Sequence, residues 1–302
     1  MASTRSPKPM NTSRAATSAA MSCSRLTTTT WRSSQPSNFL PSRIHHNAGR
    51  LSGQSIPNSS TEDTIMVALD QENRSNKSIT RVAGLFYLAI IALGIWSEMA
   101  VREMLIAPDN GPQTLANIMA SSGVFSLSLA ADIGMILSDI AVGILLYLLF
   151  RQVAPRVALA AMILRLTQAI VLAANLLFQV AAMVLLRGEH FTEAFGAEKL
   201  AWAVQALLEL QGQGYDLGLI FFGINCLLTA WLILRSGIAP RLVGLGIAAS
   251  GLVYLSGSGF TLLTGDQPIV ITFAYLIPLI AELAFAIWLL VGAGPKSAGR
   301  RN

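Results

Sequence analysis

Six long apolar stretches, separated by short polar segments, fill the chain after residue 81. Each can supply the roughly 20 apolar residues with which an α-helix crosses the hydrocarbon core of a bilayer. The pattern predicts an all-α integral membrane protein, a bundle of six transmembrane helices over residues 82–292. Pro278 predicts a kink in the sixth helix, since proline cannot donate the helical hydrogen bond. The predicted spans are residues 82 to about 100, 124–150, 157–186, about 207 to 234, 242–263 and 269–291.

Composition supports the same class of protein. Hydrophobic residues make up 53% of the chain and charged residues only 12%, about half of the ~25% typical of soluble domains. The lipid bilayer is therefore the expected partner.

The first 65 residues differ from the rest of the chain. They are rich in Ser, Thr and Arg, and their first acidic residue is Glu62. Such a segment lacks the apolar content to pack and is expected to have no regular structure. Two interpretations stay open: an organellar targeting segment, or a start codon set upstream of the natural one, with Met66 beginning a short leader over residues 66–81. No 7–15-residue apolar core of a secretory signal is present. Residues 293–302 form a basic tail.

Basic residues gather in alternate loops, which predicts the orientation of the bundle. Lys and Arg collect on the cytoplasmic side of a membrane, so both termini are expected in the cytoplasm. This pattern also explains the net charge of +5, so no nucleic-acid partner is expected. The basic residues on the predicted cytoplasmic side are Arg74, Lys77, Arg81, Arg151, Arg156, Arg235, Arg241, Lys296, Arg300 and Arg301. The opposite side holds fewer basic residues, namely Arg102, Arg187 and Lys199, accompanied by Glu103, Asp109, Glu189, Glu193, Glu198 and Asp266.

The second and third spans resemble the fourth and fifth. The sequence DIGMILSDIAVGILLYLLFRQVAPR (132–156) aligns with DLGLIFFGINCLLTAWLILRSGIAPR (216–241), so that Asp132 matches Asp216 and Ala-Pro-Arg recurs. A duplicated helical hairpin would explain the match, and same-orientation repeats occur in transporter folds. The alternative is that any cytoplasmic turn favours a basic residue and a proline near a helix start.

Charged residues inside the predicted spans are the main candidates for function. Asp132 and Asp139 lie two helical turns apart on one helix face. Counting from the basic turn between the second and third spans puts Asp139 and Arg165 at similar depths. Charges in a span are costly and usually pair inside the bundle, so we expect a buried polar layer around these two residues.

The remaining polar residues extend this layer. An inner group holds Asp139, Arg165, Asn225 and Glu282; an outer group holds Glu98, Asp132, Asn175, Asp216 and Glu209; Gln168 and Gln179 share a helix face with Arg165 and Asn175. One interpretation is a hydrated cavity that binds a small molecule or relays protons, as in a small transporter or permease. The other is a non-catalytic sensor, accessory or assembly protein whose polar residues only specify helix packing. Carboxylates outnumber the single Arg, and the excess must be protonated, solvated or matched by a bound cation.

Enzymatic and cofactor chemistry find little support in the sequence. His45, His46 and His190 all lie outside the apolar stretches, so the spans offer no histidine to activate a serine or to bind haem. Cys23 and Cys226 form no metal-binding pattern. We therefore expect no enzyme activity, no cofactor and no metal. Small residues in the fifth span, including Gly244 and Gly251, predict a helix-packing face.

Several segments carry a resemblance to a known family. They are RVAGLFYL (81–88), ADIGMILSDIAVGILLYLLFR (131–151), RLTQAIVLAANLL (165–177) and GYDLGLIFFGINCLLTAWLILRSG (214–237). In these segments the chain is similar to the bacterial multi-pass membrane proteins catalogued as domain of unknown function 4386. The resemblance covers all six predicted spans, implies this fold in a bacterial inner membrane, and transfers no catalytic residues.

Overall fold

The computed structural model describes residues 59–291, which lie in the second of the two units into which the chain divides, residues 56–302. Every regular element in this described range is a helix, as predicted. The elements are α1 (Ser59–Ser97), the π-helical η1 (Glu98–Arg102), α2 (Glu103–Leu105), α3 (Gly111–Ala120), α4 (Ser122–Phe150), α5 (Pro155–Arg187), α6 (Glu189–Phe195), α7 (Ala197–Ser236), α8 (Arg241–Thr264), α9 (Ile269–Ala274) and α10 (Leu276–Val291).

Six helical segments within residues 59–291 are long and apolar enough to cross a membrane, in agreement with the predicted number of spans. The fourth begins earlier than its apolar pattern suggests, because polar residues from Ala197 onward continue the same helix. The sixth is interrupted at Tyr275, between α9 and α10. Pro278 explains this position, since it has no N–H to donate to the carbonyl of Ala274.

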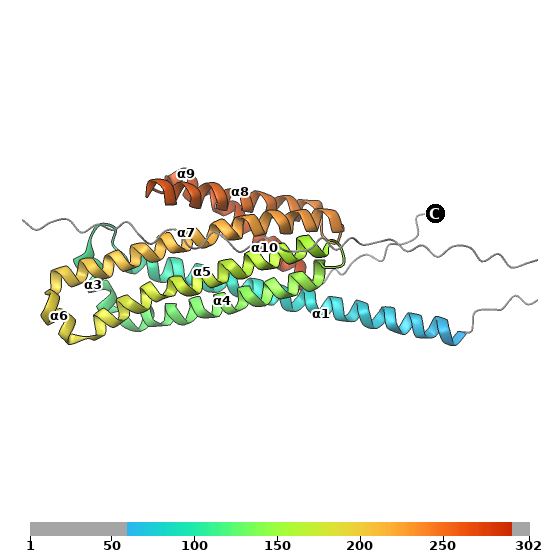
Figure 1. The fold of residues 1–302 in the computed structure, drawn as a ribbon, viewed down its shortest axis with the longest axis horizontal. Coiled ribbons are helices and arrows are strands. Elements are labelled where there is room, and N and C mark those ends of the chain that lie inside the picture. The colour runs from blue at the N-terminus through green and yellow to red at the C-terminus, as the bar shows by residue number, and fades with distance from the viewer. Residues whose placement is uncertain (1–58, 292–302) are drawn as a thin grey trace, which may run out of the picture. The chain divides into compact units, whose positions relative to one another are not determined.

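Helix α1 begins at Ser59, inside the segment for which the sequence predicts no regular structure. That prediction is therefore wrong for its last residues, and the expected leader is continuous with the first span. In Figure 1 the N-terminal turns of α1 extend beyond the turn that joins α4 and α5. The predictions for residues 1–58 and for the basic tail lie outside the described residues.

The six spans form a closed ring. Each packs against two neighbours, in the order α1, α4, α5, α7, α8, α10 and back to α1. Figure 1 shows α4, α5 and α7 side by side, with α8 next to α7. We call the end with the α4–α5 and α7–α8 turns the basic end, and the end with α3 and α6 the acidic end. Side chains from all six spans can therefore meet inside the ring.

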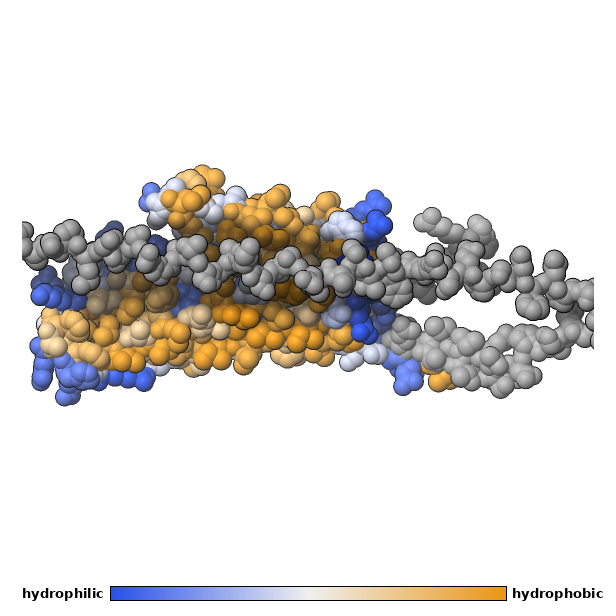
Figure 2. Space-filling model, viewed as in Figure 1, coloured by the Kyte–Doolittle hydropathy of each residue, from blue (hydrophilic) through white to orange (hydrophobic). Residues whose placement is uncertain are grey.

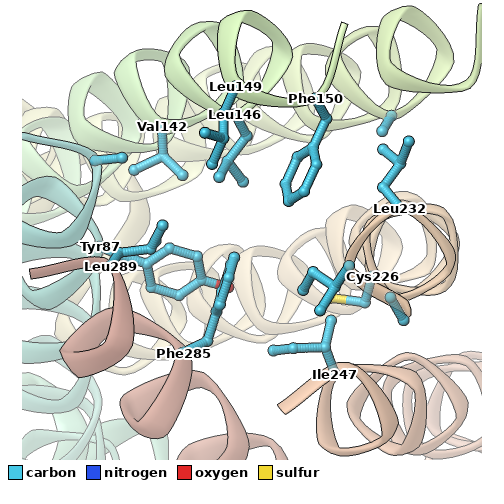
Figure 3. Close-up of a cluster of buried hydrophobic side chains, with 14 of the residues drawn as sticks. Tyr87, Val142, Leu146, Leu149, Phe150, Cys226, Leu232, Ile247, Phe285 and Leu289 are labelled. Carbon is cyan, nitrogen blue, oxygen red and sulfur yellow. The ribbon is translucent and has the colours of Figure 1, made fainter. Parts of the chain in front are cut away.

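Apolar side chains cover the outside of the ring and fill much of its inside. Figure 2 shows an apolar belt between hydrophilic surfaces at both ends, as expected for helices that face lipid. The main core cluster lies toward the basic end, where Val142 of α4, Cys226 of α7 and Phe285 of α10 are buried. Figure 3 shows these side chains converging from several helices, with Tyr87 beside Phe285.

Glycines bring some neighbouring helices very close together. A Cβ at Gly84 of α1 would lie 2.7 Å from the backbone nitrogen of Leu290 in α10. A Cβ at Gly251 of α8 would lie 2.7 Å from the carbonyl oxygen of Gly223 in α7. Small residues allow such contacts between membrane helices. The small-residue face predicted for the fifth span is thus used for packing.

Candidate functional site

The centre of the ring contains an ion pair between α4 and α5. Arg165 Nη2 lies 2.6 Å from Asp139 Oδ1, and both side chains are almost completely buried. The guanidinium also lies over the rings of Tyr87 and Phe222, 5.0 Å from each ring centre. Gly143, one turn beyond Asp139, packs against the aliphatic part of Arg165. Charge and aromatic contacts therefore hold this cation where water is scarce.

Glu282 of α10 is the second buried acidic residue of the centre. Tyr254 donates to its Oε1 at 2.7 Å, and Tyr87 donates to its Oε2 at 3.3 Å. Glu282 is 6% exposed, and no basic side chain among residues 59–291 forms an ion pair with it. Two hydroxyl donors stabilise the carboxylate without neutralising its charge.

A cavity of about 270 Å³ lies next to these groups. All six spans contribute to its wall, and so does η1. Its polar wall residues include Asp139, Gln168 and Glu282. Arg165 does not line this cavity but borders a separate void of only about 10 Å³. That volume is at the lower limit of what can hold one water molecule. Gly94 and Glu98 also line the cavity. The rest of the wall is aromatic or aliphatic and consists of Tyr215, Phe222, Tyr254, Tyr275, Ile90, Ile91, Ile95, Met99, Met135, Ile136, Leu172, Leu219 and Leu279.

A second ion pair lies nearer the acidic end. Arg102 of η1 places Nη2 2.7 Å from Asp132 Oδ2 and Nη1 3.0 Å from Glu98 Oε2. The Asp132 side chain is 2% exposed and that of Arg102 19%. Burial lowers the pKa of Arg102, but the carboxylates of Asp132 and Glu98 raise it, and the net shift is upward. The arginine therefore stays charged. The π-helical turn that carries it is a type of irregularity often found at functional sites.

A polar ladder joins α4, α5 and α7 toward the acidic end. Gln211 donates from Nε2 to Gln179 Oε1 at 3.0 Å, and Gln179 donates from Nε2 to Ser128 Oγ at 2.8 Å. Asn175 donates to the carbonyl oxygen of Gln211 at 2.8 Å. These bonds satisfy buried amides by joining neighbouring helices, which is a packing role.

The predicted polar layer is thus only partly one site. The structure brings together Asp139, Arg165, Gln168 and Glu282 around the cavity. Asp132 instead pairs with Arg102, and Asn175 belongs to the ladder. Asn225 donates to the carbonyl oxygen of Ala161 at 2.6 Å and does not line the cavity.

Asp216 differs most from the prediction. It is only half-buried, lies outside the cavity wall and interacts with Ser258 of α8. Its counterpart in the expected duplication, Asp132, is buried in an ion pair. The two matched residues therefore have different surroundings, and the duplication itself stays a prediction. Glu98 and Glu209, which the sequence places in the outer group of the polar layer, are exposed.

Sequence reasoning missed the aromatic part of the site and the partner of Asp132. Tyr87 and Tyr254 contact Glu282, and Tyr215 and Tyr275 line the cavity. A tyrosine inside an apolar helix is a usable signal, because its hydroxyl needs a polar partner when buried. The sequence pattern indicates only that Arg102 lies on the outer side of the membrane, although it follows Glu98 by one helical turn.

Comparison with known proteins gives one match. The model of a family described as a domain of unknown function (DUF4386) matches residues 82–292, which contain the six spans in full except for the N-terminal turns of α1. No curated protein and no solved structure matches the chain.

Proposed function

The chain belongs to the DUF4386 family, and we propose that it is a small-molecule carrier of a membrane, with its binding site in the central cavity. The observation that carries the proposal is a cavity of about 270 Å³ walled by all six spans and holding Asp139, Gln168 and Glu282. Pockets with apolar walls and a few convergent polar groups are typical of ligand sites. Ionisable residues within spans typically mark substrate or ion pathways.

The position of the cavity within the ring favours transport over simple binding. A carrier needs a site near the middle of the membrane that opens to either side in turn. Asp139 lies near the middle of α4, and Glu282 near the middle of α10. The interruption at Tyr275 and the π-helical η1 lie on the acidic-end side of these residues and provide places where α10 and α1 could bend.

Thiol labelling of the cavity wall tests this proposal. Leu172 of α5 lines the cavity, whereas Leu177 on the same helix is 66% exposed on the outside of the ring. In a parent with Cys23→Ser, Leu172→Cys should react with a membrane-impermeant cationic methanethiosulfonate both in intact cells and in inside-out vesicles. Leu177→Cys, facing lipid, should react in neither preparation. Cys226 is 1% exposed, so the parent should give no signal.

The result for Leu172→Cys separates the candidate functions. Labelling from both faces supports a carrier. Labelling from one face only would overturn transport and leave a receptor or sensor. No labelling from either face would overturn the binding cavity itself.

The second candidate is a non-catalytic sensor, accessory or assembly protein whose polar residues specify packing. The ladder of Gln179, Gln211 and Ser128 favours it, because these side chains satisfy one another between helices. The Asp139–Arg165 pair would then also serve to fix the contact between α4 and α5. This candidate gives no reason for Glu282 to lie beside a cavity without a basic partner.

We also propose that the protein lies in the cytoplasmic membrane of a bacterium with both termini in the cytoplasm. The distribution of Arg and Lys among the loops supports this orientation. Gln152→Cys, at the basic end, should label only in inside-out vesicles, and Glu193→Cys, at the acidic end, only in intact cells. The reverse pattern would overturn the orientation.

A further inference from the structure

The charges around the cavity do not balance. Asp139 is matched by Arg165 at 2.6 Å. Glu282 receives only the neutral hydroxyl groups of Tyr87 and Tyr254. With all these carboxylates and the guanidinium ionised, the centre carries one uncompensated negative charge. An unmatched buried charge is costly, so a ligand that brings one positive charge would bind here with an electrostatic gain.

Two hydrogen-bond acceptors of the cavity wall are unpaired. Asp139 Oδ2 and Gln168 Oε1 have no hydrogen-bond partner among the described residues, and the two residues are 4% and 6% exposed. Both residues belong to the cavity wall. An ionised carboxylate only accepts hydrogen bonds. A ligand that donates N–H bonds would therefore complement this wall, and one that mainly accepts would not.

Aromatic rings surround the same region. Tyr254 lies 5.2 Å from Phe222 and 5.8 Å from Tyr275, measured between ring centres, and all three line the cavity. The faces of such rings attract organic cations. The hydroxyl of Tyr254 points to Glu282, so the aromatic group and the unmatched carboxylate act on the same part of a ligand.

The rim of the cavity is apolar and exposed on one side. Ile95 is 40% exposed, Met99 58% and Leu279 36%, and the first two lie beside Glu98. These residues come from α1, η1 and α10. The two helices α1 and α10 touch closely at Gly84 near the basic end, so the exposed rim lies farther along them, toward the acidic end. A ligand with an apolar body would be retained at such a rim.

We propose that the carried molecule is a small protonated amine with an aromatic or aliphatic body, its ammonium group bound by Glu282, Asp139 and Gln168. This inference rests on the carrier function proposed above. A bare metal ion is a poorer match, because no group of three His, Cys, Asp or Glu side chains among residues 59–291 could hold one. A volume of about 270 Å³ is slightly below the ~300–1,000 Å³ of pockets for drug-sized ligands, which favours a molecule with one ring.

Three probes that share a phenyl ring test the ligand class on the full-length protein in lipid nanodiscs. They are 2-phenylethylammonium, the neutral 2-phenylethanol and the anion phenylacetate, each measured by calorimetry and by protection of Leu172→Cys from labelling. The ammonium should bind roughly 10-fold or more tightly than the alcohol, the scale of one desolvated charge contact. Phenylacetate should not bind. Equal affinities for the ammonium and the alcohol in the wild-type chain would overturn the proposal.

Matched variants locate the contact. Glu282→Gln should lose roughly 10-fold or more of its affinity for 2-phenylethylammonium. Glu193→Gln, which removes an exposed carboxylate from α6, should leave the affinity unchanged. Where Glu282→Gln does not fold, the comparison of the three probes on the wild-type chain still tests the ligand class. Loss of ammonium selectivity in Glu193→Gln, or its retention in Glu282→Gln, would overturn the assignment to Glu282.

The two proposals fail in different ways. If Leu172→Cys labels from both faces but the three probes bind alike, the carrier stands and the amine is overturned. If Leu172→Cys labels from neither face, the cavity is closed and both proposals are overturned.

Discussion

Helix α4 takes part in two ion pairs, and the more enclosed partner is the cation in one pair and the anion in the other. In the pair near the basic end, the cation is the enclosed group: Arg165 lies between two aromatic rings, whereas Asp139 lies on the cavity wall. In the pair nearer the acidic end, the anion is enclosed: Asp132 is 2% exposed, whereas Arg102 is 19% exposed and has a second acidic partner. Asp132 and Asp139, which lie two helical turns apart on α4, therefore have different electrostatic roles.

This difference indicates what each pair does for the protein. A buried charge that loses its partner is expensive, whereas one that reaches water is stabilised by solvation. Arg165 is thus a fixed cation that depends on Asp139. Arg102 instead neutralises the enclosed Asp132 from the edge of the bundle and also contacts Glu98. The enclosed charge is thus Arg165 at the centre of the ring and Asp132 nearer the acidic end.

Removing Asp139 should have the largest effect. Asp139→Asn keeps the shape of the side chain but strands Arg165, and breaking a buried pair costs about 3–5 kcal/mol. The free energy of unfolding in mild detergent should fall by that amount. Asp139→Asn combined with Arg165→Met should recover much of the loss, because no charge is then left without a partner.

The single variant Arg165→Met sharpens the comparison. It leaves Asp139 stranded on the wall of a cavity that can hold water, so it should cost less than Asp139→Asn. A double-mutant cycle measures the coupling between the two residues. A coupling near zero would show that this pair does not stabilise the bundle.

At the acidic end the order of the single variants should be reversed. Arg102→Gln leaves Asp132 buried without its cation and should cost about 1–3 kcal/mol. Asp132→Asn leaves Arg102 partly exposed and paired with Glu98, so its cost should stay below about 1 kcal/mol. Thermal unfolding of both variants checks the order. A larger loss for Asp132→Asn would contradict the view that the anion is the enclosed partner.

The close contact of α1 with α10 near the basic end gives a test of helix packing. A Cβ at Gly84 would lie 2.7 Å from the nitrogen of Leu290 and 2.9 Å from the carbonyl oxygen of Ala286, both backbone atoms. Gly84→Ala should therefore cost about 1–3 kcal/mol from overpacking, reduced by the better helix propensity of alanine. Gly123→Ala on α4 is the control, since apart from its chain neighbours and the local helix backbone nothing lies within 4 Å of its Cβ position. Equal melting temperatures for the two variants would show that α1 and α10 can separate freely.

The number and type of the spans could be predicted from the sequence because lipid imposes a length and an apolar composition on each one. The depth of Asp139 and Arg165 followed from counting residues along two helices joined by a short turn. The neighbours of Glu282 could not be predicted in this way, because Tyr87 and Tyr254 come from helices whose rotation and order in the ring depend on side-chain packing. Arg102 was missed because the π-helical turn carries it back toward α4.

The polar ladder should show the smallest effects, since it distributes its stabilisation over several bonds. Ser128→Ala removes the hydroxyl that accepts from Gln179, while Gln179 keeps the carbonyl oxygen of Phe125 at 3.2 Å as an acceptor. Interhelical hydrogen bonds of this kind contribute about 0.6 kcal/mol on average and about 1.7 kcal/mol at most, so the loss should lie near the lower value. Ser126→Ala, at a half-buried position of the same helix, is the control. A loss well above the upper value would show that the ladder, rather than the Asp139–Arg165 pair, determines the packing of α4 against α5.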